Sequence, residues 1–325
     1  MTTDAMPSGS PDRIAGGHSD DGADHSAARQ AAFARFRWYN ASVLKGLFAA
    51  ALFDQTMLPT VSAGVESTGR IRFTPFERAF RTAAADQLAF WSEDPDRSVE
   101  FERLKRLHRD VKGVGYNGIR YSALNPESWN WILYSTIFMM RNAYTPITGE
   151  ELSEQDDQFF WEFVTEAFSG LELPGRGRLP ATYVEALHHY DEMVRTKLRR
   201  TKTLDNVVES LLSPPVPEFL PRVSRPMWSI VGPVIGHIVF ICSFGIMHPD
   251  VRKMAPVEWT RLNRFEFQVA ATLLPLAYRY LPKRLQYSPL AYNRWRYEQL
   301  VARYQAMGLD SFAPPPGGLG CPFTA

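Results

Sequence analysis

Cysteine is nearly absent from this sequence, which has only Cys242 and Cys321 among its 325 residues. Two cysteines this far apart, one of them in a Pro/Gly-rich tail, exclude a disulfide framework, a CxxC redox pair and a zinc knuckle. An excess of one charge is also lacking, because 36 Lys and Arg stand against 35 Asp and Glu, a net charge of +1. A chain this close to neutral gives no electrostatic reason to expect a nucleic-acid partner.

Several motifs of nucleotide-binding and hydrolytic proteins are missing as well. The sequence contains no Walker A loop, no GxSxG and no HExxH, so it does not predict the sites that depend on them. A carboxylate-bridged di-iron bundle needs two ExxH motifs on different helices, and only the motif from Glu185 to His188 is present. The adjacent His188 and His189 point in different directions on a helix, so they cannot both bind one ion.

Runs of alternating β-branched residues are lacking too, whereas apolar residues at helical spacing are abundant. We therefore expect an all-α fold, a single large multi-helix bundle over residues 31–308. Thr74-Pro75, Asp94-Pro95 and Asn125-Pro126 are typical helix starts. Residues 1–30 are rich in Gly, Ser and Asp and contain no apolar signal segment. We expect them to be disordered, residues 309–325 to form a flexible tail, and the cytosol to be the default compartment.

One long segment carries no formal charge. Between Pro226 and Pro249 there is no Asp, Glu, Lys or Arg, a length that could span a bilayer. Several glycines and Pro233 interrupt it. We interpret it as the buried central helix of the bundle, with His237 packed in the core, and peripheral membrane contact is the main competing interpretation.

The helix predicted after Asp94-Pro95, and expected to end at Gly113, has one histidine within an apolar face. That face comprises Phe101, Leu104, Leu107, His108 and Val111. A lone histidine in such a stripe is more often a core residue than a ligand, but burial also favours the neutral imidazole that binds metals. Both interpretations of His108 stay open on this pattern.

Basic residues accompany this histidine in the sequence. Arg78 and Thr82 are four residues apart and share one helix face, with Arg81 beside them. Lys112 is expected one turn beyond His108 on the same side. Basic groups in a helical core are costly unless paired, and a haem would satisfy them, because iron accepts imidazole and the propionates accept guanidinium.

The segments 78–82 and 108–113, in this order, resemble the signature of the latex-clearing protein (rubber oxygenase) and MpaB oxygenase superfamily. The segments 118–126 and 281–289 are similar to two further segments of that family. The resemblance covers about residues 35 to 300. It implies an all-helical fold that encloses one haem b in an apolar pocket, with His108 as the axial iron ligand.

The resemblance also implies roles for the basic residues. Arg81 and Thr82 are implied as catalytic residues near the haem, and Arg78 and Lys112 as cofactor-binding residues. The partners implied are O₂ and an apolar small molecule, since characterised relatives cleave isoprenoid double bonds. Three positions depart from the family: Arg81 replaces a lysine, Lys112 replaces an arginine, and Leu133 stands where many relatives have histidine. Arginine and lysine differ in geometry and pKa, so these exchanges bear on reactivity more than on haem binding.

We therefore expect a haem b-dependent oxygenase that acts on an apolar, isoprenoid or lipid-like substrate. The three departures keep open a second hypothesis, a non-catalytic haem or lipid carrier. A third is a membrane-associated helical protein without haem, in which the charge-free segment inserts and His108 is structural.

Overall fold

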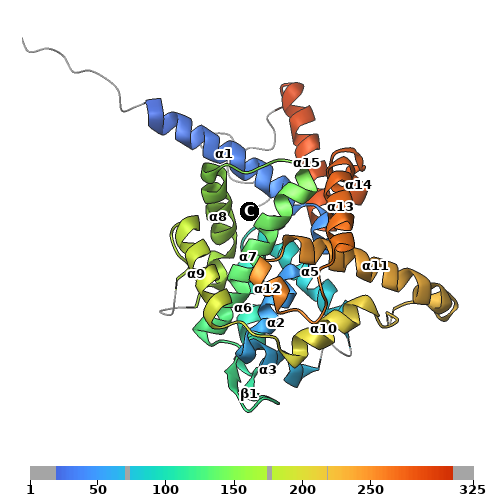
Figure 1. Cartoon of the computed structure of the whole chain (residues 1–325). Coiled ribbons are helices and arrows are strands. Elements are labelled where there is room, and N and C mark those ends of the chain that lie inside the picture. Colours follow the sequence, from blue (N-terminus) through green and yellow to red (C-terminus); the bar gives the residue numbers. More distant parts are fainter. Residues whose placement is uncertain (1–19, 70–73, 174–177, 218, 310–325) are drawn as a thin grey trace, which may run out of the picture.

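Helices make up almost all regular structure in this computed structural model, which describes residues 20–69, 74–173, 178–217 and 219–309 (Figure 1). The longer helices are α1 (Asp20–Asn40), α2 (Ala50–Met57), α3 (Pro59–Thr68), α5 (Pro75–Trp91), α6 (Asp96–Arg109), α7 (Pro126–Thr148), α8 (Glu154–Phe168), α9 (Tyr183–Thr196), α10 (Lys202–Leu212), α11 (Arg225–Ile246), α13 (Arg261–Tyr280) and α15 (Pro289–Ala306). The short elements are η1 (Val43–Leu47), β1 (Lys112–Val114), β2 (Arg120–Ser122), η2 (Ser169–Leu171), η3 (Arg222–Ser224), α12 (Pro249–Lys253) and α14 (Lys283–Gln286). The predicted all-α class is confirmed.

Local capping residues explain where several helices begin. α5 starts at Pro75 directly after Thr74 and runs to Trp91, as the sequence predicts. α7 starts at Pro126, and the side chain of Asn125 accepts hydrogen bonds from the first free backbone N–H groups. α8 follows a reciprocal capping box between Ser153 and Asp156. The side-chain caps of α7 and α8 satisfy donors that a helix start leaves unpaired, and Pro75 occupies the first turn of α5, where its missing N–H costs no hydrogen bond.

The first helix begins earlier than expected. α1 starts at Asp20, inside the segment predicted to be disordered, and Arg29 forms an ion pair of 2.8 Å with Glu162 of α8. Arg35 also pairs with Asp156 of α8. These partners lie more than a hundred residues away, so the composition of residues 1–30 could not reveal them. Residues 1–19 and 310–325 lie outside the described part of the chain.

α6 ends at Arg109 and not at Gly113, because the following residues form a small hairpin. β1 pairs antiparallel with β2, with Lys112 opposite Ser122, and the turn uses Gly118 at a φ of 73°. An Asn-Gly pair favours such a turn. Lys112 therefore lies in a strand, and the prediction that it lies one helical turn beyond His108 is wrong.

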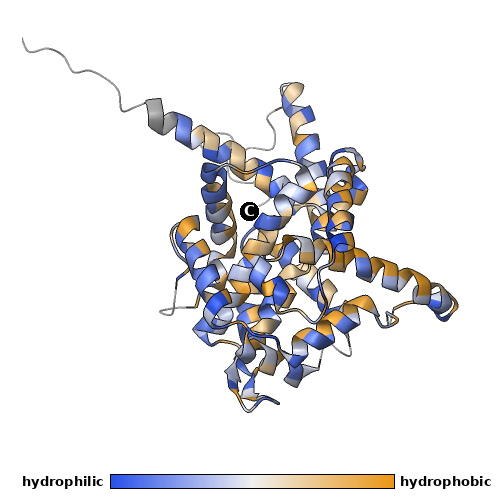
Figure 2. Cartoon of the chain, viewed as in Figure 1, coloured by the Kyte–Doolittle hydropathy of each residue, from blue (hydrophilic) through white to orange (hydrophobic). Residues whose placement is uncertain are grey.

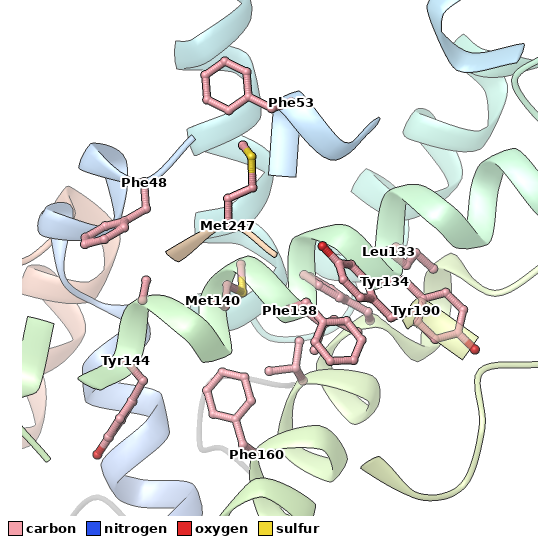
Figure 3. Close-up of a cluster of buried hydrophobic side chains, with 14 of the residues drawn as sticks. Phe48, Phe53, Leu133, Tyr134, Phe138, Met140, Tyr144, Phe160, Tyr190 and Met247 are labelled. Carbon is pink, nitrogen blue, oxygen red and sulfur yellow. The ribbon is translucent and has the colours of Figure 1, made fainter. Parts of the chain in front are cut away.

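The core is built around α7, which lies at the centre of the molecule and packs against α2 and α13. Its Trp131, Ile137 and Tyr144 are fully buried. Figure 3 shows aromatic side chains from neighbouring helices converging on it, among them Phe160 of α8 and Tyr190 of α9. This continuous aromatic and aliphatic core fixes the positions of the helices around it.

α11 is the charge-free segment, and only its C-terminal half is buried. Phe240 and Phe244 are in the core, and the backbone N–H of Ala49 donates to Ser243 Oγ at 2.7 Å. The N-terminal half projects from the body (Figure 1). The prediction of a buried central helix is thus right for one half and wrong for the other. His237 is also not a core residue, because it is exposed and its Nε2 lies 3.2 Å from a carboxylate oxygen of Glu266.

Candidate functional site

The predicted basic residues of α5 lie beside an apolar cleft. This cleft has a volume of about 380 Å³ and lies between the N-terminal half of α5 and the residues Pro215, Val216 and Phe219. Its walls are aromatic, with the rings of Phe80 and Phe219 5.5 Å apart. Phe76 joins them and contacts Trp228 of α11 edge-to-face at 5.4 Å. The lining of the cleft is suited to an apolar ligand.

Arg81 is the charged group that reaches this cleft from the predicted site. Its guanidinium forms an ion pair with Glu77 one turn earlier, and two-thirds of its side chain is exposed. Thr82 is exposed on the same helix, and Arg78 is half-buried. A surface ion pair of this kind contributes little to stability, so the guanidinium of Arg81 can leave Glu77 and bind a ligand at little cost.

His108 lies in the last turn of α6 with its imidazole half-buried. Its Nδ1 is 2.7 Å from the carbonyl oxygen of Leu104, and its ring meets Trp129 of α7 edge-to-face at 5.3 Å. A carbonyl only accepts, so Nδ1 carries the proton and Nε2 of the neutral ring keeps its lone pair. A ring held this way is the arrangement that metal-bound histidines commonly use.

The predicted apolar face around His108 is largely confirmed. Phe101 is buried, and Leu104 and Val111 are partly buried beside the histidine. Leu107 is the exception, because 55% of it is exposed. The stripe is therefore narrower than the sequence indicated.

The cleft beside α5 does not bring all the predicted site residues together. Arg81 faces the α5 cleft, whereas His108 packs against α7 and is not part of that cleft's wall. Lys112 is exposed in β1. Leu133, which replaces a histidine of many relatives, is buried in the apolar core of α7.

Asp54 of α2 is a buried acid that the sequence analysis missed. Its Oδ2 accepts a hydrogen bond from the hydroxyl of Tyr190, while Oδ1 has no hydrogen-bond partner among the described residues. Removal from water raises the pKa of Asp54 to about 7. Tyr190 also lines a second cleft of about 430 Å³, with His248 and Arg141 on its wall. The sequence signal that could have revealed Asp54 is its position as the single acidic residue of the apolar helix Ala50–Met57.

The chain matches the family described as ER-bound oxygenase mpaB/B'/Rubber oxygenase, catalytic domain, over residues 34–276. Because this match covers most of the chain, the protein belongs to that family of oxygenase catalytic domains, which confirms the suspected superfamily. Two relatives are "Uncharacterized protein Mb2261" of Mycobacterium bovis and "Uncharacterized protein Rv2237" of Mycobacterium tuberculosis. Each is 24% identical over 240 residues, which is 73% of this chain and 89% of the relative. No solved structure shows a significant match to the chain.

Proposed function

We propose that this protein is a haem b-dependent oxygenase that acts on an apolar, isoprenoid or lipid-like substrate, with His108 as the axial iron ligand. Membership of the oxygenase family supports the reaction class. The observation that carries the ligand assignment is the 2.7 Å contact of His108 Nδ1 with the Leu104 carbonyl, which leaves Nε2 as a lone-pair donor.

The donor groups of the described residues fit a haem better than a bare metal ion. No group of three or more His, Cys, Asp or Glu side chains comes together in those parts of the chain, so a free ion would lack protein ligands. A haem brings its own equatorial nitrogens and needs only one imidazole from the protein. Arg78 and Lys112 would pair with its propionates through charge-assisted hydrogen bonds.

When bound, the haem supplies the chemistry of O₂, and the chain supplies binding and polarity. The rings of Phe76, Phe80 and Phe219 would contact the hydrocarbon of the substrate. The guanidinium of Arg81 lies beside Glu77 at the wall of the cleft, where its charge would orient polar groups of the substrate. The hydroxyl of Thr82, on the next residue, can donate or accept one hydrogen bond.

The ligand assignment is tested by absorption spectroscopy of the full chain after addition of haemin. We expect a Soret band that His108→Ala abolishes or shifts strongly. His188→Ala is the matched control, since His188 is exposed on α9, and it should leave the spectrum unchanged. An unaltered Soret band in His108→Ala would reject His108 as the ligand.

Oxygen uptake separates an oxygenase from a carrier. With a panel of prenyl substrates, the haem-loaded protein should consume O₂ in proportion to the substrate converted. The exchanges at Arg81, Lys112 and Leu133 favour the carrier as the alternative. Stable haem binding without O₂ uptake across the panel would support that alternative.

A further inference from the structure

The projecting half of α11 exposes an apolar stripe. Its residues recur every three or four positions along one helix face and are 39% to 72% exposed: Met227, Ile230, Val231, Val234, Ile235 and Ile238. A surface helix of a globular protein normally turns such a stripe toward the core. Here the stripe faces away from the protein.

Tight packing on α10 fixes this orientation of α11. Trp228 Nε1 donates to the carbonyl oxygen of Pro215 at 3.0 Å. A Cβ atom added to Gly236 would lie 1.9 Å from the carbonyl oxygen of Leu211. Gly236 lies on the face opposite to the exposed stripe, so α11 cannot rotate to bury its apolar residues without losing its contact with α10.

The neighbouring helix α13 exposes a second apolar stripe. Its residues are 41% to 69% exposed: Leu262, Phe265, Val269, Leu273, Leu276 and Tyr280. α13 adjoins α11, because Phe267 packs where Gly245 has no side chain and Glu266 faces His237 at 3.2 Å. Figure 2 shows apolar residues along both helices. We call the two stripes together the α11–α13 face. An exposed apolar area of this extent is typical of an interaction surface.

The charges around this face are predominantly positive. Residues 222–286 contain nine Lys or Arg and three Asp or Glu, a net charge of +6 in a chain whose total is +1. Six exposed arginines there form no ion pair with another described residue: Arg222, Arg225, Arg261, Arg264, Arg279 and Arg284. Unpaired cations that flank an apolar helix face complement the phosphates of an anionic bilayer. A second copy of the chain would bring the same positive charge and be repelled.

The geometry limits how deeply α11 can enter a bilayer. The segment 222–246 is the described helix that has the length and composition to cross a membrane. Its residues from Phe240 to Phe244 are buried in the protein core. The 14 residues from Arg225 to Ile238 span about 21 Å at 1.5 Å per residue, less than the roughly 30 Å of a hydrocarbon core.

We infer that the α11–α13 face docks on the surface of a bilayer that contains anionic phospholipid. The apolar stripes enter the interfacial region, and the flanking arginines contact lipid phosphates. This inference does not depend on haem or on the oxygenase reaction.

Flotation of the full chain with vesicles tests this inference. The protein should float with vesicles of phosphatidylcholine and phosphatidylglycerol, bind pure phosphatidylcholine at least tenfold more weakly, and be released by salt. The double variants Ile230→Asp/Val234→Asp and Arg261→Glu/Arg264→Glu should each lower binding at least tenfold.

Matched controls carry the same changes on other surfaces. Val99→Asp/Val184→Asp alters equally exposed apolar residues of α6 and α9, and Arg296→Glu/Arg303→Glu alters exposed arginines of α15. Both controls should bind like the wild type. Unchanged binding in the α11 and α13 variants, or equal losses in the controls, would overturn the inference.

Sedimentation and haem spectra complete the test. A wild-type dimer that Ile230→Asp/Val234→Asp dissociates would assign the face to a second copy and also overturn the inference. Unfolding curves of all four variants should match the wild type, because the altered side chains are exposed. Their Soret bands should also be unchanged, so failure here is distinguishable from failure at His108.

Discussion

Asp54 gives the stability of the protein a defined dependence on pH. Its folded pKa of about 7 lies above the ordinary value of 3.8, so the folded state holds a proton that the unfolded chain releases more readily. The resulting stabilisation is complete below about pH 4, declines as pH rises, and is lost above about pH 7.

Asp54→Asn should remove this dependence while keeping an acceptor for Tyr190. From about pH 5 to pH 7, the free energy of unfolding of the wild type should fall relative to the variant, by up to about 1.4 kcal/mol per pH unit. Above pH 7 the difference should be constant. Urea unfolding across this range measures it, and a difference that is flat from pH 5 upward would show that Asp54 is already ionised in the fold.

Thr82 is tested by removing its hydroxyl. Under the proposed function, Thr82→Ala should leave the Soret band in place and change the rate of O₂ uptake severalfold, because one polar group near the substrate is lost. Thr196→Ala removes a hydroxyl that bonds within α9 and serves as the control. Loss of haem from Thr82→Ala would instead give Thr82 a structural role.

Single residues were predictable where their role depends on near neighbours. The partial burial of His108 follows from its helical stripe, and its Nδ1 bond goes to a carbonyl four residues earlier. The exposure of Arg81 and the Tyr190 partner of Asp54 depend on which helices pack nearby. No pattern within a single helix encodes such packing.

At the scale of elements, the contact of α10 with α11 is the one that orients the exposed stripe. Gly236→Ala should destabilise the protein by about 1–3 kcal/mol, because the new methyl group overlaps the Leu211 carbonyl. Gly46→Ala is the control, because no atom lies within 4 Å of its added Cβ, and it should change stability by less than about 0.5 kcal/mol. Thermal unfolding of both variants provides the comparison, and similar melting temperatures would contradict the tight contact.

The residues at which helices start were predictable from the sequence, but the burial and orientation of some helices were not. The start of α5 follows from proline geometry, and that of α7 follows from proline geometry together with the side-chain cap of Asn125. The orientation of α11 depends on glycines that meet α10, and the early start of α1 accompanies ion pairs with α8. Hydropathy is the same whether an apolar helix is buried or exposed, so the sequence pattern could not distinguish the two halves of α11.

At the scale of the whole molecule, the apolar cleft and the α11–α13 face are connected. Phe76 on the cleft wall contacts Trp228 of α11, and Phe219 belongs to the chain that leads into this helix. If both proposals hold, a substrate dissolved in lipid reaches Arg81 from the docked side. Ile230→Asp/Val234→Asp should then lower O₂ uptake at least tenfold with substrate in anionic vesicles. With the same substrate in detergent micelles, the variant should match the wild type. Equal losses of O₂ uptake in vesicles and in micelles would show that the α11–α13 face does not deliver the substrate.

The contact between Phe76 and Trp228 joins the substrate cleft to the helix that is proposed to dock on the bilayer, and this connection has a kinetic consequence. A hydrophobic substrate that stays in the bilayer diffuses to the enzyme in two dimensions. Its rate of encounter with the enzyme therefore depends on its mole fraction among the lipids. Adding inert phospholipid while the total amount of substrate is kept constant would therefore slow turnover, although the bulk concentration of the substrate is unchanged.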